Sequence, residues 1–113
     1  MKYFVEEEAG PVRQALEDAV LDWPEVTTKR MFGCPAFMAA GKLFTFVVTR
    51  GVVLTGLSDE YLESVREQME TEEFRAGERL IGDWVLVPMD GPEDLADIVP
   101  FIEASYEGAL DKA

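Results

Sequence analysis

The chain has 113 residues, a length that suits one domain and allows a hydrophobic core to form without disulfides or a metal. Its 23 acidic and 10 basic residues give a formal net charge of -13, which opposes binding to phosphate backbones and to anionic membranes. The absence of histidine excludes Ser-His-Asp and Cys-His catalysis and any zinc site that contains histidine.

The first predicted element is a helix over residues 6–22. Its apolar residues recur at helical spacing and form one stripe, made of Val12, Ala15, Leu16, Ala19, Val20 and Trp23. Pro11 suits the first turn if the helix begins beside it, and bends the helix if it begins earlier. Pro24 marks the end of this helix, because the residue before a proline avoids helical backbone angles.

Four strands are expected next, and the first of them is rich in β-branched residues. They span residues 26–32, 36–40, 43–49 and 52–57. We expect a bend or bulge at residues 33–35 and tight turns at residues 41–42 and 50–51. Turns this short predict an antiparallel meander.

Alternation along the strand at residues 43–49 predicts which side chains share a face of the sheet. The face packed on the helices is expected to hold Phe44, Phe46 and Val48. The other face is expected to hold Leu43, Thr45, Val47 and Thr49. Because the second set mixes threonine with aliphatic residues, we expect that face to be partly exposed.

A second helix is expected from Ser58, a good N-cap followed by acidic residues. Residues 71–80 are polar and are expected to be irregular, with Phe74 as an anchor. A fifth strand is predicted at residues 84–88 and a last helix from Gly91 onward. Its helical period continues past Pro100, which predicts a kink or two abutting helices.

The predicted order of elements is α-β-β-β-β-α-β-α. Tight hairpins combined with separate helices favour an α+β class over a parallel α/β fold. We therefore expect residues 1–113 to form a single domain. It would be a two-layer sandwich, with helices packed on one face of a five-stranded antiparallel sheet.

No motif for a nucleotide or a metal occurs in the sequence, so we expect no cofactor and no metal. Gly41-Lys42 is followed by leucine, which indicates a hairpin turn and not a phosphate-binding loop. Acidic clusters such as residues 6–8 and 70–73 suit solvated loops and helix ends. A carboxylate-based enzyme acting on a small molecule or using a metal stays an alternative.

Two other features carry candidate sites. Cys34 has Lys29 and Arg30 nearby in sequence, which would favour a thiolate, but a buried or inert thiol is the stronger expectation. Four cations fall on or near the hairpins, namely Lys29, Arg30, Lys42 and Arg50. They form either a local basic patch or scattered solubilising charges, and strand alternation predicts opposite faces for Lys29 and Arg30.

The compartment can also be predicted. The single cysteine, Cys34, allows no internal disulfide, which fits a reducing environment. The first residues lack an apolar signal-peptide core, and the apolar runs are too short to span a membrane. We expect a cytoplasmic protein with no membrane association, whose acidity reflects either ordinary intracellular composition or adaptation to high salt.

One stretch resembles a known family. Its residues are Arg30-Met31-Phe32-Gly33, then Phe37, then Gly41-Lys42-Leu43-Phe44, followed later by Phe74, Trp84 and Val87-Pro88. This pattern resembles the signature of the TfoX N-terminal-domain family. The resemblance implies a two-layer α/β sandwich, similar to type III secretion chaperones and YjbR-like proteins. It implies the domain alone, and not the role of the longer competence regulator that gives the family its name.

The family supplies no agreed catalytic residues, so the motif suggests structural roles. Gly33 and Gly41 would allow tight backbone turns. Met31 or Phe32, together with Phe44, would fill the core. Cys34 stands where family members often have a second glycine.

The leading hypothesis is a non-enzymatic regulatory or protein-interaction module. The half-apolar sheet face would form a homodimer or bind an unknown protein partner. We expect that face to hold Leu43, Thr45, Val47, Val53 and Thr55. A nucleic-acid-binding regulator of transcription or competence is the alternative suggested by the resemblance, although the net charge opposes it.

Overall fold

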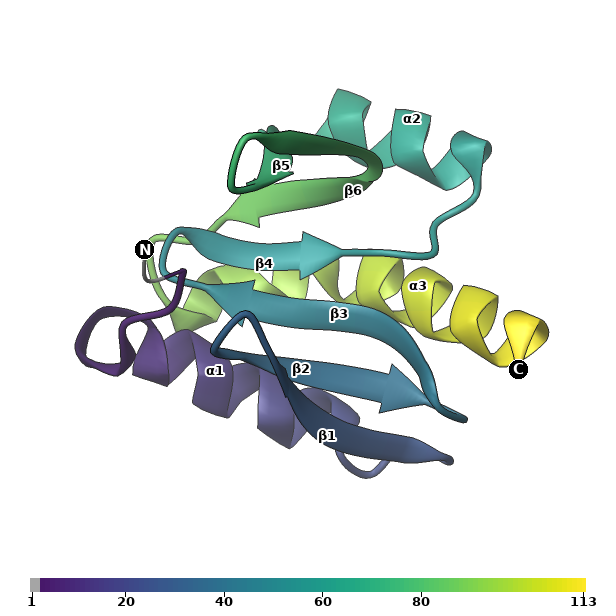
Figure 1. Cartoon of the computed structure of the whole chain (residues 1–113), viewed down its shortest axis with the longest axis horizontal. Coiled ribbons are helices and arrows are strands. Elements are labelled where there is room, and N and C mark those ends of the chain that lie inside the picture. Colours follow the sequence, from purple (N-terminus) through teal and green to yellow (C-terminus); the bar gives the residue numbers. More distant parts are fainter. Residues whose placement is uncertain (1–2) are drawn as a thin grey trace.

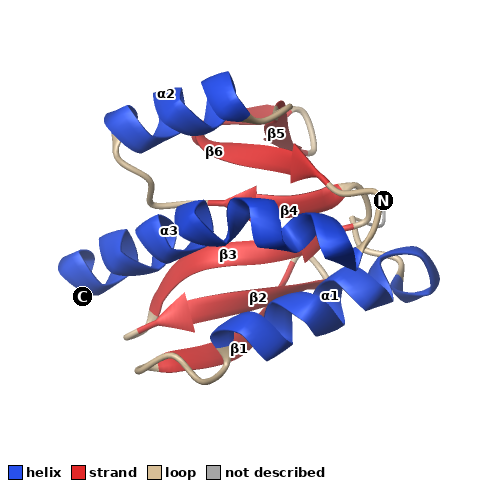
Figure 2. Ribbon diagram, turned by 180° about the vertical axis from the view of Figure 1, so that it is seen from behind, coloured by secondary structure: helices blue, strands red, loops and turns tan. Residues whose placement is uncertain are grey.

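A computed structural model describes residues 3–113, and Met1 and Lys2 of the predicted domain lie outside the described residues. Helices cover one face of an antiparallel six-stranded sheet with strand order β1-β2-β3-β4-β6-β5, as Figures 1 and 2 show. The two-layer α+β sandwich expected from the sequence is therefore confirmed, with six strands in place of five.

The elements follow one another with short connections. The strands are β1 (Val26–Met31), β2 (Cys34–Ala39), β3 (Lys42–Val48), β4 (Gly51–Leu54), β5 (Glu72–Ala76) and β6 (Arg79–Pro88). The helices are α1 (Glu6–Val20), α2 (Asp59–Gln68), the 3-10 helix η1 (Pro92–Ile98) and α3 (Val99–Lys112). α1 and α3 lie across the sheet in Figure 2, and α2 lies beside the β5–β6 end.

The helices begin and end for local reasons. α1 begins at Glu6, so Pro11 lies inside the helix and not in its first turn. Ser58 caps α2 by accepting a hydrogen bond from the Tyr61 amide. η1 and α3 abut at Ile98, whose backbone leaves the helical region, and Pro100 falls in the first turn of α3. The prediction of two abutting helices is confirmed.

Two hairpin turns use positive backbone angles. Phe32 and Gly33, with φ of 55° and 78°, connect β1 to β2, and Ala40 and Gly41, with φ of 50° and 82°, connect β2 to β3. Positive φ at both central residues is the two-residue turn that matches the twist of paired strands. The bend or bulge predicted at residues 33–35 was wrong, because β2 already begins at Cys34.

The irregular segment predicted at residues 71–80 was also wrong. This segment contains β5, a two-residue turn at Gly77 and the start of β6. β5 is an edge strand whose ladder to β6 shifts between Glu73 and Phe74. Its charged outer side chains and this bulge hide the strand period in the sequence.

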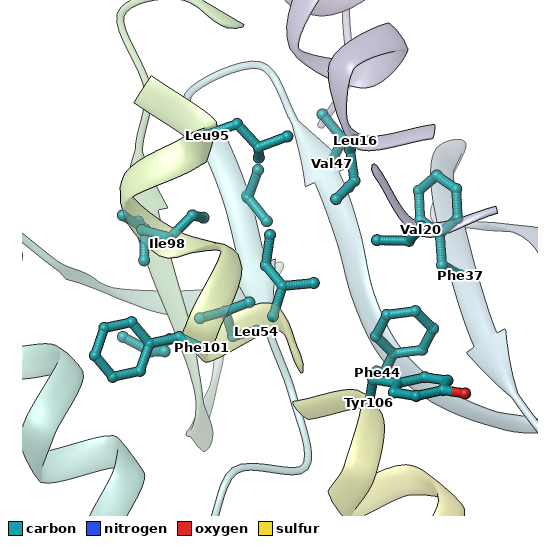
Figure 3. Packing of buried hydrophobic residues seen from close by; sticks show 14 of the residues in the cluster. Leu16, Val20, Phe37, Phe44, Val47, Leu54, Leu95, Ile98, Phe101 and Tyr106 are labelled. Atoms are coloured by element: carbon teal, nitrogen blue, oxygen red, sulfur yellow. The ribbon is translucent and has the colours of Figure 1, made fainter. Parts of the chain in front are cut away.

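A second bulge changes which side chains face the helices. Phe37 pairs with Thr45 whereas Met38 pairs with Leu43, so Phe44 is an extra residue in β3. Phe44 packs in the helix-facing core that Figure 3 shows, together with Val47. Phe46 and Val48 pack on the opposite side of the sheet. Strict alternation therefore misplaced them, because a bulge reverses the facing of the residues beyond it.

The side of the sheet away from the helices holds a second, smaller core. Its buried members are Cys34, Ala36, Phe46, Val48, Val53, Phe74 and Leu86. Aromatic rings pack edge to face within it, with centroids 5.2 Å apart for Phe46–Phe74 and 5.4 Å for Phe46–Trp84. Half-buried residues rim this core, among them Tyr3, Met31 and Trp84.

The sheet face that was predicted to be partly exposed is therefore covered. Thr45, Val47, Val53 and Thr55 are buried, and Leu43 is half-buried. Val47 and Val53 also belong to different cores on opposite sides of the sheet. The Thr45 and Thr55 hydroxyls donate to backbone carbonyls of Val53 and Leu43 across the β3–β4 pair. The homodimer was predicted from the exposure of this face, and the burial of its residues removes that argument.

Candidate functional site

The first strand, β1, forms one free edge of the sheet. It pairs with β2 over all six of its residues without a register shift, from Val26 opposite Ala39 to Met31 opposite Cys34. Its four central side chains, Thr27, Thr28, Lys29 and Arg30, are all exposed. A regular exposed edge of this kind is a template on which another chain can pair.

The hairpin turns determine which backbone groups of β1 face outward. Met31 and Cys34 flank a two-residue turn and therefore exchange hydrogen bonds, and the Ala40 amide donates to the Glu25 carbonyl, 3.0 Å away. The N–H and C=O groups of successive residues point to opposite edges of a strand, so those of Lys29 form hydrogen bonds with β2. The amides and carbonyls of Thr28 and Arg30 consequently point away from the sheet.

The two cations on β1 carry charge that no described acid neutralises directly. Among residues 3–113, the ion pairs join Arg13 to Glu6 and Glu17, and Arg50 to Glu72. Arg30 instead donates one hydrogen bond to the Gly33 carbonyl oxygen, 2.9 Å away, which holds its side chain at the turn. Most other cations in the described part of the chain also lack an ion pair, so Lys29 and Arg30 are distinguished by their adjacent positions on a sheet edge and not by being unpaired.

A pocket of about 320 Å³ lies between α1 and the β1–β2 hairpin. Its polar wall contains Glu6, Arg13, Glu17, Thr28, Lys29 and Arg30, and its apolar wall contains Pro35, Ala36 and Phe37. Arg13 donates to both Glu6 and Glu17, at 3.0 Å and 2.8 Å, and these carboxylates raise the pKa of its guanidinium. The pocket therefore holds the Arg13 and Arg30 guanidinium groups and two acids that are already hydrogen-bonded to Arg13, whereas the Lys29 side chain, opposite Ala36 of the second core, faces the other side of the sheet.

An apolar group stands at the turn end of β1. The Phe32 side chain is 49% exposed, and its ring centroid lies 5.7 Å from that of Tyr3. Tyr3 also packs on Phe74, and its hydroxyl accepts a hydrogen bond from the Gly77 amide at 2.7 Å. Tyr3 thus connects the β1–β2 turn to the β5–β6 hairpin. Of the two residues expected to fill the core, Met31 packs against the second core, whereas Phe32 is exposed.

The four predicted basic residues do not converge. The Arg30 side chain faces the pocket beside α1, whereas Lys29, opposite Ala36 of the second core, faces the other side of the sheet, as strand alternation predicts. Lys42 lies in a separate hollow with Asp83, Trp84 and Lys112. Arg50 is paired with Glu72 at the other edge of the sheet. This arrangement offers a nucleic acid no continuous positive surface.

Cys34 is fully buried in the second core, beneath the β1–β2 turn. Burial raises the pKa of its thiol to about 11, and the charge of Arg30 opposes this shift only in part. The Sγ atom lies 3.8 Å from the Phe32 carbonyl oxygen, to which it donates. A neutral, enclosed thiol is a poor nucleophile, so slow reaction with thiol reagents stays the expectation.

The remaining motif residues have structural surroundings. Gly41 occupies a turn position with positive φ, Phe44 is buried against α3, and Met31 and Trp84 rim the second core. Among residues 3–113, no three histidine, cysteine or acidic side chains lie close enough together to hold a metal ion. None of these positions presents a group arranged for chemistry.

Sequence reasoning missed three contributors to this edge, namely Tyr3, Arg13 and Thr28. Arg13 had a usable signal, because Glu17 follows it at the helical i+4 spacing. Thr28 matters through its backbone direction, which depends on the exact turn residues. Tyr3 contacts residues more than 70 positions away in sequence, and no local pattern announces such a contact.

Comparison with known proteins places the chain in a family. The family model described as the TfoX N-terminal domain matches residues 18–109, which include every strand and most of the helical layer. No match was found among curated proteins or among solved structures. In the described part of the chain, no helix is long and apolar enough to cross a bilayer. The chain belongs to the TfoX N-terminal domain family.

Proposed function

We propose that this chain is a non-enzymatic protein-interaction module that binds an extended segment of a partner protein along β1. The observation that carries the proposal is the regular, exposed β1 edge with the backbone groups of Thr28 and Arg30 pointing outward. An extended peptide that adds to such an edge gains main-chain hydrogen bonds, and flanking pockets supply specificity.

The surroundings of β1 support this function. Phe32 offers an exposed aromatic surface at one end of the strand, and the pocket beside α1 lies along its flank. Both features lie within reach of side chains that alternate along an added strand. A module that captures a partner in this way, without changing it chemically, suits a regulatory role, and the free Cys34 thiol suits the cytoplasm.

A homodimer through β1 is disfavoured by charge. In a symmetric antiparallel pair, Lys29 and Arg30 of one copy would approach the same residues of the other copy. Like charges that face each other across strands are destabilising. The partner is therefore a different protein.

The proposal is tested by titrating the ¹⁵N-labelled protein with a capped peptide of about eight residues, in which glutamate and valine alternate. We expect the amide signals of Thr28, Arg30 and Phe32 to shift. The matched control is the same peptide with alternate backbone nitrogens methylated, which removes the hydrogen bonds of one edge. Equal binding by the methylated peptide, or shifts centred on another element, would contradict strand addition.

A further inference from the structure

We infer that the pocket between α1 and β1 receives an acidic side chain of the partner strand, and that this contact selects the partner. The inference rests on the proposed strand addition, which it deepens by naming the partner's chemistry. It concerns a site formed by the side chains of Arg13, Arg30 and Pro35 on the helix-facing side of the β1–β2 hairpin.

The position of the pocket follows from strand geometry. Arg30 and Thr28 line the pocket, and their backbone groups are the ones that point out of the sheet. Side chains of an added strand alternate between the two faces of the sheet. Every second side chain would therefore extend the helix-facing side of β1, where the pocket lies.

The charge of the pocket determines which side chain is accepted. Glu6 and Glu17 are both bonded to Arg13, so the positive charge of Arg30 remains without an acidic partner among the described residues. A guanidinium has five N–H donors, and Arg30 has one recorded hydrogen bond, to Gly33. Donors that remain free on Arg30 can bind a carboxylate, and charge-assisted bonds of this kind are about twice as strong as neutral ones.

The apolar wall favours a side chain with a methylene stem. Pro35 is half-buried and lies opposite Arg30 in the strand pairing, so its ring offers an apolar surface beside the Arg30 guanidinium. A glutamate or aspartate can pack its stem there while its carboxylate reaches Arg30. A phosphate backbone would gain the cations, but it would also meet the strongly acidic remainder of the chain.

The test compares two capped peptides of about eight residues, one alternating glutamate with valine and one alternating glutamine with valine. Binding is measured by calorimetry, and the position of binding by the amide shifts of Thr28 and Arg30. We expect both peptides to shift these amides and the acidic peptide to bind about tenfold more tightly. We expect the preference to weaken as salt is added.

Variants locate the preference. Arg30→Gln should remove much of the advantage of the acidic peptide while leaving the binding of the neutral peptide unchanged, and Lys29→Gln, on the other face of the sheet, should have a smaller effect. The matched control is Lys42→Gln, which removes an exposed cation from the separate hollow near Trp84 and should change neither affinity.

The possible results distinguish failure of the acidic pocket from failure of strand addition. Equal affinity for the two peptides at β1 would overturn the acidic pocket and leave strand addition in place. The absence of any shift at Thr28 and Arg30 would overturn strand addition itself. An acidic preference that Lys42→Gln removes, or self-association of the chain through β1 seen by sedimentation, would overturn this choice of site or partner.

Discussion

The two edges of the sheet differ in how they are protected from pairing. β5 is short, bulged between Glu73 and Phe74, and held by Arg50 through Glu72. Tyr3 also binds the turn that follows β5. β1 is unbulged over six residues, and its cations have no acidic partner among the described residues. Figure 1 shows the two strands at opposite ends of the sheet.

This difference indicates where the molecule can accept another chain. Proteins protect sheet edges with bulges and charges, and β5 has both, in addition to the bond from its turn to Tyr3. β1 has only its charges, which repel a second copy but attract an acidic strand. An edge that is closed to like chains and open to unlike ones is suited to selective binding. The predictions below change one edge at a time.

The largest effect on the free energy of unfolding is expected from prolines placed along β1. Lys29→Pro removes an amide that is bonded inward to β2, and should lower the free energy of unfolding by about 2–3 kcal/mol. Thr28→Pro removes an amide that points outward, and should cost less than about 1 kcal/mol. Urea denaturation of both variants measures the difference. Equal destabilisation would show that the outward assignment of Thr28 is wrong.

The next effect concerns the thiol beneath the β1–β2 turn. The unfolded Cys34 thiol, with a pKa near 9.0, ionises before the folded one, whose pKa is about 11. Stability due to the buried neutral thiol is therefore complete below about pH 9 and is lost as pH rises through about 11, by at most about 2–3 kcal/mol.

The measurement is the free energy of unfolding against pH for the natural chain and for Cys34→Ala. Because lysines and tyrosines titrate in the same range, the difference between the two curves isolates the thiol. We expect this difference to fall between about pH 9 and 11. Parallel curves would mean that the thiol ionises as easily in the folded protein as in the unfolded chain.

A moderate effect is expected at the link between the two edges. Tyr3→Ala removes the ring contacts with Phe32 and Phe74 and should cost about 2 kcal/mol. Tyr3→Phe removes only the acceptor for the Gly77 amide and should cost about 1 kcal/mol or less. Hydrogen exchange should quicken at Gly77 in both variants. If Tyr3→Ala leaves the β5–β6 hairpin unchanged, Tyr3 does not restrain that edge.

The smallest effect is expected at the ion pair beside β5. Arg50 is exposed, so its bond to Glu72 is screened by solvent although it raises the pKa of the guanidinium. Arg50→Gln should leave the thermal midpoint unchanged, because exposed pairs contribute little. It should also leave peptide binding at β1 unchanged. Loss of peptide binding in this variant would mean that the two edges are coupled.

Most of the fold could be predicted from the sequence. The helical stripe of α1, the abutting of η1 and α3, and the β3–β4 hairpin all follow from periodicity and turn residues. β5 could not be predicted in this way, because edge strands expose most of their side chains and Phe74 alone marked it. The bulge at Phe44 was also hidden, since it arises from pairing between strands and not from either strand alone.

The candidate site was only partly visible in the sequence. Lys29, Arg30 and Phe32 were singled out as motif residues, but their meaning depends on β1 being an edge. That position follows from strand order, which depends on long-range packing. Strict alternation also suggested an exposed face at Val47 and Val53, whereas these residues fill two separate cores.

Amide hydrogen exchange at the two edges tests the central claim most directly. In the free protein, the amides of Thr28 on β1 and of Arg75 on β5 should both exchange quickly, because each points away from its neighbouring strand. Addition of the peptide that alternates glutamate with valine should slow exchange at Thr28 and Arg30 and leave Arg75 unchanged. Protection at Arg75, or at neither edge, would contradict the assignment of β1 as the binding edge.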